Sequence, residues 1–576
     1  MRLPQPDLER FRQRLASLDA LPQLCLLGLV SGLLAGLLMV AFRMLLQLGA
    51  TLWLADGNPE AFEQLSPELR SLLPLLAVLL IGIWLWRQPS AGRRIGISHV
   101  IERLTLHQGR FPLRNWLTQW WVGLLSVLGG LSAGREGPAI HLGAAAASGL
   151  GASLRLPNNS LRVLTACGAA AGISASFNTP IAGVIFAMEV VMMEYTMLGF
   201  MPVILASFTA ALVTQLVYGP QPAFSIPGMQ LESLWNLPWI VVGALLVGIL
   251  AALFVRIAHS TRPTIAPIWL RFCMAGLLTA GVAWWYPQVQ GMGYDSLQLM
   301  LDHQLPLQIL LVLALGKLLL TAITVACGVP VSIIGPILVI GGAIGALTAL
   351  LAASLMPEQA ASAAVFVTLG MAAMMGAVLQ APLAALMAIL ELTHSPSMIM
   401  PGMLAVVIAG LTARQLGCRG FFATGSLMEA REKPLIQVLS RLSVAAAMQR
   451  NFETTPRQID RAQATALLAS NPGWLLVERD NQQAPRIALQ AAALSHWLTA
   501  HSDSQDETTS EPLIDLLELP GQRLELQSVD IQSTLAEAWQ RLQAEDVDAL
   551  YVEQAHPRRP ARIVGLLTSA DMERHY

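Results

Sequence analysis

Long runs of apolar residues, separated by short polar or Gly- and Pro-containing breaks, dominate the chain up to about residue 425. They lie at about residues 23–55, 71–86, 116–131, 137–152, 162–175, 180–195, 198–218, 235–257, 265–286, 306–327, 336–355, 362–378, 382–393 and 399–416. Several are shorter than the ~20 residues that a simple membrane-spanning helix needs. Broken helices at membrane depth are tolerated only where they are buried in protein or line a cavity. The pattern therefore predicts an all-α polytopic transporter or channel.

The chain also contains an internal repeat. At one constant offset, Gly168, Pro180 and Glu189 match Gly370, Pro382 and Glu391. At a nearly equal offset, Gly137-Pro138 and Gly143 match Gly335-Pro336 and Gly341. Two repeated halves with broken helices in corresponding places put a substrate site at their interface, near the middle of the membrane.

The stretch 128–149 places Arg135 and Glu136 inside an otherwise apolar, small-residue segment. Ionisable groups in such surroundings are costly unless they face a partner or a water-filled cavity. Gly137-Pro138 follows them, and Pro suits the first turn of a helix because it has no amide to leave unpaired. The start of that helix would direct free N–H groups and a positive dipole end at an anion. We interpret the stretch as half of an anion pathway, with a structural Arg135–Glu136 pair as the alternative.

Glu136 is the main candidate for the chemistry of this pathway. A carboxylate in a narrow path of low dielectric constant can occupy an anion site itself, or take up a proton and withdraw. A second candidate is Glu189, which lies about two and a half turns into a helix that Pro180 opens. Glu189 is interpreted as a proton or counter-charge group, or equally as a structural acid. For its repeat mate Glu391 the structural interpretation is favoured.

Composition agrees with a membrane protein. Charged residues make up 12% of the chain and hydrophobic residues 54%, whereas soluble globular proteins carry about 25% charged residues. The net charge of −2 gives no reason to expect a nucleic-acid partner. The five cysteines form neither a metal spacing nor a disulfide framework, and His99, His107 and His141 have no ligand partners at metal spacing. We therefore assign no metal site.

The boundaries follow from changes of character along the chain. Residues 1–20 are charged and amphipathic, which predicts a cytoplasmic lead-in helix at the interface. Residues 21–428 form the predicted membrane domain, with repeat halves at about 21–218 and 235–425. The tail divides into 429–500, a polar linker at 501–512, and 513–576.

Arginine clusters suggest the orientation of the chain. They lie at Arg10–Arg14, Arg87–Arg94 and Arg256–Arg271, and such clusters mark cytoplasmic segments. We expect a multi-pass protein of the cell inner (plasma) membrane with both termini in the cytoplasm. In the tail, Thr568-Ser569-x-Asp571 predicts a strand that enters a capped helix.

A membrane-bound enzyme or sensor, with the tail as its active part, is the alternative of a different class. The tail shows no paired catalytic acids, no Cys/His dyad and no phosphate loop. We therefore do not expect an enzyme.

The motifs G-R-E-G-P (134–138), F-N-T-P-I-A-G (177–183) and G-P-I-L-V-I-G-G-A-I-G (335–345) resemble those of the CLC family of chloride channels and chloride/proton antiporters. The resemblance covers about residues 20–425. It implies an inverted-repeat, homodimeric membrane protein in which each subunit has its own anion pore. By that likeness Glu136 is the gating glutamate, flanked by Arg135 and Gly137, and the amides of Ile333 and Ile334 face the anion.

Three positions depart from the family's pattern. Ile95 stands where the family's inner filter has an anion-coordinating Ser. Phe422 stands where the family has a Tyr whose hydroxyl contacts the anion, and Phe cannot donate that hydrogen bond. Val190 follows Glu189 where antiporters commonly carry a second acid that relays protons. The resemblance thus implies chloride transport through a channel, with a chloride/proton antiporter as the alternative and a fluoride- or nitrate-preferring relative as a further one.

The tail resembles a pair of cystathionine β-synthase-type modules, of which the first is degenerate. The G-L-L-T-S-A-D pattern (565–571) is similar to the adenosine-nucleotide motif of such modules. The resemblance implies that Thr568 and Asp571 could hold a ribose. A dimer-stabilising domain that binds no cofactor is the alternative.

Overall fold

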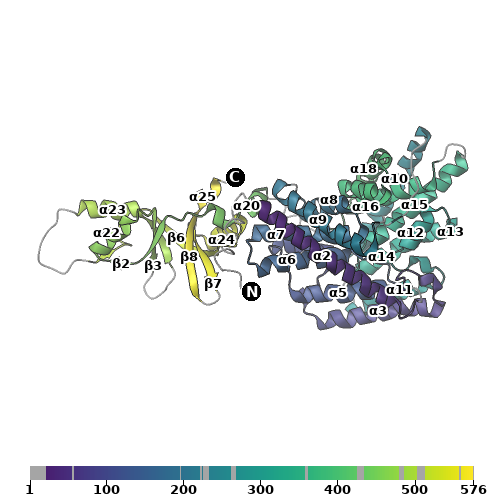
Figure 1. The fold of residues 1–576 in the computed structure, drawn as a ribbon, viewed down its shortest axis with the longest axis horizontal. Helices are drawn as coiled ribbons and strands as arrows, with labels where there is room; N and C mark the ends of the chain where they lie inside the picture. The colour runs from purple at the N-terminus through teal and green to yellow at the C-terminus, as the bar shows by residue number, and fades with distance from the viewer. Residues whose placement is uncertain are drawn as a thin grey trace. The chain divides into compact units, whose positions relative to one another are not determined.

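The computed structural model describes residues 21–54, 57–194, 196–220, 224, 233–260, 267–356, 361–423, 434–478, 485–501, 513–556 and 559–574. The predicted lead-in helix at 1–20 and the predicted linker beyond residue 501 lie outside these ranges. The chain separates into two compact units (Figure 1). One comprises Leu24–Leu154 and Leu161–Ala430, and the other comprises Met1–Gln23, Arg155–Ser160 and Arg431–Tyr576.

The first unit is helical. Its α-helices are α2 (Leu21–Ala50), α3 (Pro67–Arg87), α4 (Gly96–Leu106), α5 (Leu113–Leu128), α6 (Glu136–Ser153), α7 (Asn158–Phe177), α8 (Pro180–Phe186), α9 (Met197–Tyr218), α10 (Leu237–Ala258), α11 (Ile268–Ala283), α12 (Tyr294–Leu301), α13 (Leu307–Leu311), α14 (Leu318–Ala326), α15 (Ile334–Leu355), α16 (Ala363–Leu379), α17 (Pro382–Thr393) and α18 (Ile399–Gln415). Two π-helical segments, η3 (Ala187–Met192) and η7 (Val312–Lys317), continue α8 and join α13 to α14. Among the described residues, eight helices are long and apolar enough to cross a membrane. This confirms a multi-pass membrane protein.

The apolar pattern does not predict two short helices, α4 and α12. Both mix charged residues with apolar ones, such as Glu102 and Arg103 in α4 and Asp295 in α12. Their hydrophobicity is therefore too low to stand out. Both contribute to the interior of the helical unit, because α4 packs against α6 and α12 packs against α15.

The repeated glycines lie at two matching helix crossings. Gly143 of α6 faces Gly168 of α7, and Gly341 of α15 faces Gly370 of α16. A Cβ atom on any of these four residues would lie closer than 3.0 Å to the carbonyl oxygen of its partner. Small residues let membrane helices approach backbone to backbone. The repeat in the sequence is therefore a repeat in the packing.

The second unit is an α/β region. Its strands are β1 (Phe452–Pro456), β2 (Gln458–Ile459), β3 (Trp474–Glu478), β4 (Pro485–Gln490), β5 (Ile514–Asp515), β6 (Arg523–Asp530), β7 (Ala549–His556) and β8 (Arg559–Thr568). Its helices are α20 (Pro434–Arg441), α21 (Val444–Ala447), α22 (Arg461–Ala469), α23 (Ala491–Ala500), α24 (Leu535–Glu545) and α25 (Ser569–Glu573). Together with the helical unit, this region confirms the predicted all-α membrane domain with an α/β tail.

A mixed six-stranded sheet of order β1-β3-β4-β6-β7-β8 organises the α/β region, beside the antiparallel pair β2-β5. β1 pairs with β3, and β6 with β7, in parallel, whereas the remaining neighbours are antiparallel. The chain order strand, helix, strand, strand, helix occurs as β6-α24-β7-β8-α25, and it also occurs as β1-α22-β3-β4-α23 with the short strand β2 inserted between β1 and α22. The predicted strand entering a capped helix is confirmed where β8 ends at Thr568 and α25 begins.

Candidate functional site

The two motif segments of the repeat meet backbone to backbone. The amide of Gly134 donates to the carbonyl of Ser332 at 2.9 Å, as an isolated antiparallel bridge. The amide of Gly137 donates to Ser332 Oγ, also at 2.9 Å. Because α6 begins at Glu136 and α15 begins at Ile334, the starts of two helices from the two halves converge here.

The side chain of Glu136 lies fully buried at this convergence. Its Oε2 accepts hydrogen bonds from the amide of Gly335 at 3.2 Å and from Ser332 Oγ at 3.4 Å. Its Oε1 accepts one from the hydroxyl of Tyr294, at the start of α12. Amides at a helix start and hydroxyl groups recognise negative charge in general. The carboxylate therefore occupies a small site whose Gly335 amide and Ser332 hydroxyl would also suit a free anion.

Two glycines make room for this carboxylate. A Cβ atom on Gly134 would lie closer than 3.0 Å to the carboxylate of Glu136. A Cβ atom on Gly137 would lie 2.8 Å from the Cβ of Ser332. The glycines of the G-R-E-G-P motif thus serve close approach between the two halves.

The contacts found for the Arg135 side chain are with groups other than the Glu136 carboxylate. Its Nη2 donates to the carbonyl of Ser176 at 3.0 Å, and its guanidinium lies 5.6 Å from the ring centroid of Tyr294. The ion pairs found among the described residues do not join Arg135 to Glu136. The geometry therefore disfavours the alternative of a structural Arg135–Glu136 pair, and Arg135 as an anion ligand stays a prediction.

The other predicted anion ligands fall in several places. Ile333 and Ile334 are buried at the start of α15, but the amide that donates to Glu136 belongs to the next residue, Gly335. Ile95 precedes α4 with its side chain in a hydrophobic cluster, and the ring of Phe422 packs edge-on against Phe421, with centroids 5.2 Å apart. As ligands, these residues and Gly137 stay predictions.

Glu189 and its repeat mate Glu391 cap each other's helices. The carboxylate of Glu189 accepts the amides of Leu383 at 3.2 Å and Ala384 at 2.7 Å, in the first turn of α17. The carboxylate of Glu391 accepts the amides of Ile181 at 2.8 Å and Ala182 at 2.6 Å, in the first turn of α8. Negative charge at a helix start satisfies amides that have no partner within the helix. This geometry favours the structural interpretation, and a proton or counter-charge role of Glu189 stays a prediction.

Glu189→Ala and Glu391→Ala are each expected to lower the stability of the detergent-solubilised protein, by a similar amount of about 1–3 kcal/mol. Each change leaves two helix-start amides without their charged acceptor. Thermal unfolding followed by tryptophan fluorescence measures the effect. A Glu189→Ala variant with unchanged stability but altered ion transport would instead support the counter-charge role.

The candidate nucleotide residues of the tail are engaged within the chain. Asp571 Oδ2 accepts from the amide of Thr568 at 3.0 Å and from its hydroxyl at 2.7 Å, and Thr568 Oγ1 accepts from the amide of Asp571. Gln449 Nε2 also donates to the Asp571 carboxylate, at 2.8 Å. These contacts form a helix cap, and ribose binding by Thr568 and Asp571 stays a prediction.

Two of the histidines that stand apart in the sequence are partners in the structure. His99 Nδ1 and His141 Nε2 lie 2.8 Å apart, and Phe111 packs edge-on against both rings. This pairing joins α4 to α6. Sequence spacing could not reveal it, because the two residues lie on different helices.

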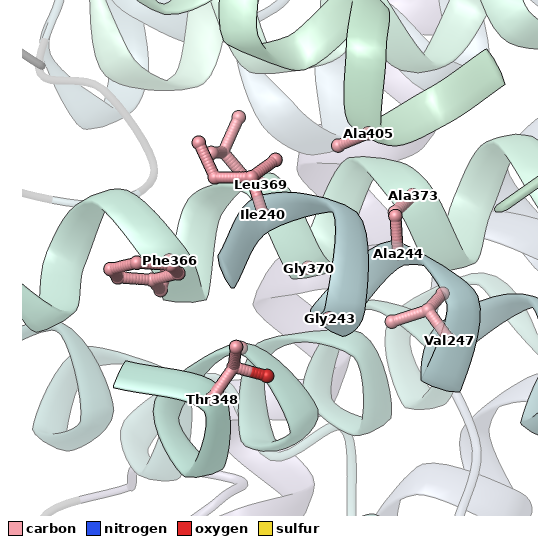
Figure 2. Close-up of a pocket in the computed structure, with 11 residues that line it drawn as sticks. Ile240, Gly243, Ala244, Val247, Thr348, Phe366, Leu369, Gly370, Ala373 and Ala405 are labelled. Carbon is pink, nitrogen blue, oxygen red and sulfur yellow. The ribbon is translucent and has the colours of Figure 1, made fainter. Parts of the chain in front are cut away.

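An apolar cavity lies between α10, α15, α16 and α18 (Figure 2). Thr348 carries the polar side chain of its lining, and that hydroxyl already donates to the carbonyl of Ile344 at 2.8 Å. Since anion sites need polar groups that converge on the ligand, this cavity does not suit an anion. The site at Glu136 is therefore the candidate.

Sequence reasoning missed three residues of the site: Ser332, Gly335 and Tyr294. Gly335 opens the 335–345 motif and Ser332 lies three residues before it, so for these two residues only the choice of donor was missed. Tyr294 lies outside both motifs. Its signal was a polar aromatic residue directly after Gly291-Met292-Gly293, at the start of a helix that hydrophobicity does not predict.

Comparisons with known proteins agree on one family. A sequence model described as voltage gated chloride channel matches residues 75–414. A protein of Ralstonia nicotianae named as a ClcB-like chloride channel protein is 30% identical, over 62% of this chain and 84% of its own length. The H(+)/Cl(-) exchange transporter ClcA of Vibrio cholerae is 27% identical, over 68% of this chain and 86% of its own length.

Solved structures share the fold. A slow cyanobacterial Cl-/H+ antiporter matches with a TM-score of 0.63 at 22% identity, over 72% of this chain and 99% of its own. A eukaryotic CLC transporter matches with a TM-score of 0.60 at 16% identity, over 96% of this chain and 99% of its own. These likenesses confirm the CLC fold.

Proposed function

We propose that this chain, which belongs to the voltage gated chloride channel family, exchanges chloride for protons across a membrane. Glu136 is the proposed gate. As a member of this family, the chain is an anion transport protein and not an enzyme. The observation that carries the proposal is the seat of the Glu136 carboxylate. The carboxylate accepts the amide of Gly335 and the hydroxyl of Ser332, two donors that would also hold chloride, and it accepts the hydroxyl of Tyr294 as well.

Competition between the carboxylate and the anion provides the mechanism. While Glu136 is ionised and seated, its oxygens satisfy the donors and no anion can bind there. Protonation removes the negative charge, which weakens its hold on these donors and lets the side chain leave. An anion then enters. A proton and an anion would thus use the same site in turn, which is the requirement for exchange.

The names of the ClcA relative and of the solved antiporter support exchange over passive flow, whereas the R. nicotianae relative is named as a chloride channel protein. The V. cholerae protein is named as an H(+)/Cl(-) exchange transporter, and the cyanobacterial structure is described as a Cl-/H+ antiporter. We further propose a homodimer with one pore in each subunit, in the cell inner membrane, with cytoplasmic termini. Chloride is the proposed anion. A fluoride preference is a weaker alternative, suggested by the fold of a CLC-type fluoride/proton antiporter.

Val190 favours a second candidate, a passive chloride channel. This residue is buried and apolar, and it follows Glu189, whose carboxylate is held by helix amides. Neither side chain offers a ready proton acceptor on the route to Glu136. If protons cannot reach Glu136 from the cytoplasmic side, the gate opens without exchange.

Proteoliposomes separate the two candidates. Vesicles loaded with high chloride, and given valinomycin to balance charge, are expected to take up protons as chloride leaves, so the weakly buffered outer medium becomes alkaline. Protein-free vesicles and a protonophore give the baseline. Chloride efflux without any proton movement would replace exchange by the channel.

A further inference from the structure

We propose that Tyr294 is a positioning residue, which latches the carboxyl group of Glu136 in the anion site and is itself held in place by Glu60. The inference rests on the gate assignment of the proposed function, but not on proton exchange. It starts from a contact that neither repeat motif supplies. The hydroxyl of Tyr294 reaches Oε1 of Glu136 from a third element, α12.

The two carboxylate oxygens have different partners. Oε2 takes the donors of the converging halves, Ser332 Oγ and the amide of Gly335. Oε1 takes Tyr294. A spherical anion bound at the position of Oε2 has no second oxygen atom that could accept the Tyr294 hydroxyl. The hydroxyl of Tyr294 is therefore the donor that favours a seated carboxylate over a seated anion.

The backbone of Tyr294 is fixed by a charged side chain from another segment. Glu60 lies between α2 and α3, and its Oε2 accepts the amides of Tyr294 at 2.6 Å and Asp295 at 3.3 Å. These amides open α12 and have no acceptor within the helix. Hydrogen bonds to a carboxylate are shorter and stronger than neutral ones. Glu60 thus fixes where α12 begins.

The turn before α12 is fixed by a second charged side chain. Lys317, at the end of η7, is fully buried, and its Nζ donates to the carbonyls of Val289 at 3.0 Å, Gln290 at 3.4 Å and Gly291 at 3.1 Å. A buried ammonium group is costly unless its hydrogen bonds are made. The start of α12 is therefore held by one acidic and one basic side chain.

The ring of Tyr294 lies near two aromatic rings and a guanidinium group. Its centroid lies 6.0 Å from that of Phe177 and 5.7 Å from that of Phe224, and the guanidinium of Arg135 is 5.6 Å away. A change to Phe keeps these ring contacts and removes only the hydroxyl. Tyr294→Phe is therefore a clean test of the latch.

Several charged groups surround the latch and gate among the described residues. Glu136, Arg135 and Glu60 interact electrostatically with Tyr294, and Asp295 interacts with Glu60. Lys317 interacts with Glu60, Glu63 and Asp295, and Arg43 interacts with Arg135. Tyr294→Phe removes none of these charges. Any change in the pH response of the variant thus comes from the lost hydrogen bond to Glu136.

The experiment is chloride efflux from proteoliposomes over a series of external pH values. A hydroxyl that donates to a carboxylate stabilises its ionised form. Tyr294→Phe is therefore expected to move the midpoint of the pH dependence about one unit higher, and to raise flux about tenfold where the wild-type gate is mostly ionised. In a Glu136→Gln background the same change is expected to have no effect, because no ionised carboxylate is left to latch.

Two further variants complete the design. Tyr286→Phe is the matched control, because the hydroxyl of Tyr286 accepts from Gln308 Nε2 at 2.6 Å, away from the gate. It is expected to behave like the wild type. Glu60→Gln keeps an acceptor but loses the charge, so it is expected to move the midpoint in the same direction by less. It also tests the latch if Tyr294→Phe does not fold.

Three outcomes would overturn the latch. One is a wild-type midpoint and flux in Tyr294→Phe. Another is a higher chloride concentration for half-maximal flux, which would make Tyr294 an anion ligand. The third is an effect that persists in the Glu136→Gln background. An unchanged pH response in Glu136→Gln itself would instead remove the gate assignment, and so distinguishes failure of the gate from failure of the latch.

Discussion

Glu136→Ala is expected to transport chloride at a rate that no longer depends on external pH, and to move no protons. The side chain is the only part of residue 136 that reaches the donors at Ser332 Oγ and Gly335 N. Without it, the donors stay open to the anion at every pH. One unit above the wild-type midpoint about one gate in ten is protonated, so the variant is expected to carry about ten times the wild-type flux there.

The measurement is chloride efflux and proton uptake from the same vesicles at several external pH values. Glu136→Gln is the companion variant, because it keeps the volume of a protonated glutamate and removes the charge. Both variants should lose the pH response. Retention of a wild-type pH profile by either would assign the gate to another group. Glu391→Gln is a suitable control, since that acid caps a helix and lies outside the site.

Gly143→Val is expected to prevent correct folding of the helical unit. An added Cβ at this position would lie closer than 3.0 Å to the carbonyl oxygen of Gly168, which is backbone and cannot turn away. The crossing of α6 and α7 would have to open, and overpacking of this kind costs about 1–3 kcal/mol or more. Since α6 begins at Glu136, the separation would also displace the gate.

Gly149→Val provides the matched control on the same helix, because an added Cβ there meets no atom within 4 Å. The fraction of protein that elutes as a single species in detergent, and its thermal unfolding, compare the two variants. Gly341→Val, at the corresponding crossing of α15 and α16, is expected to behave like Gly143→Val. Equal yield and stability for Gly143→Val and Gly149→Val would contradict the close crossing.

Much of the fold could be predicted because the residues that repeat in the two halves are small residues at helix crossings. Gly143, Gly168, Gly341 and Gly370 are needed where backbones touch, so their spacing survives in both halves. The functional role of Glu136 could be predicted because a carboxylate in an apolar membrane segment is costly unless it has a partner or a function. The capped helix at Thr568 could be predicted because its cap is local in the chain.

The rest depends on contacts between distant segments. The contact of Tyr294 with Glu136 could not be predicted, because hydrophobicity does not predict α12. The two residues are also 158 residues apart in the chain. Glu189 could be interpreted as a proton carrier because its partners, the amides of Leu383 and Ala384, lie in the other half. The pairing of His99 with His141 was equally invisible.

The exchange of caps between α8 and α17 has a consequence for biosynthesis. The first turn of α8 is completed by Glu391, and Glu189 finds its acceptor role only on α17. A nascent chain therefore leaves the N–H groups of α8 without this partner until the ribosome has passed residue 391. The amino-terminal half must wait, partly assembled, for the second half to be inserted. Genes that encode either half alone would yield a chain that lacks the carboxylate needed at its own helix start.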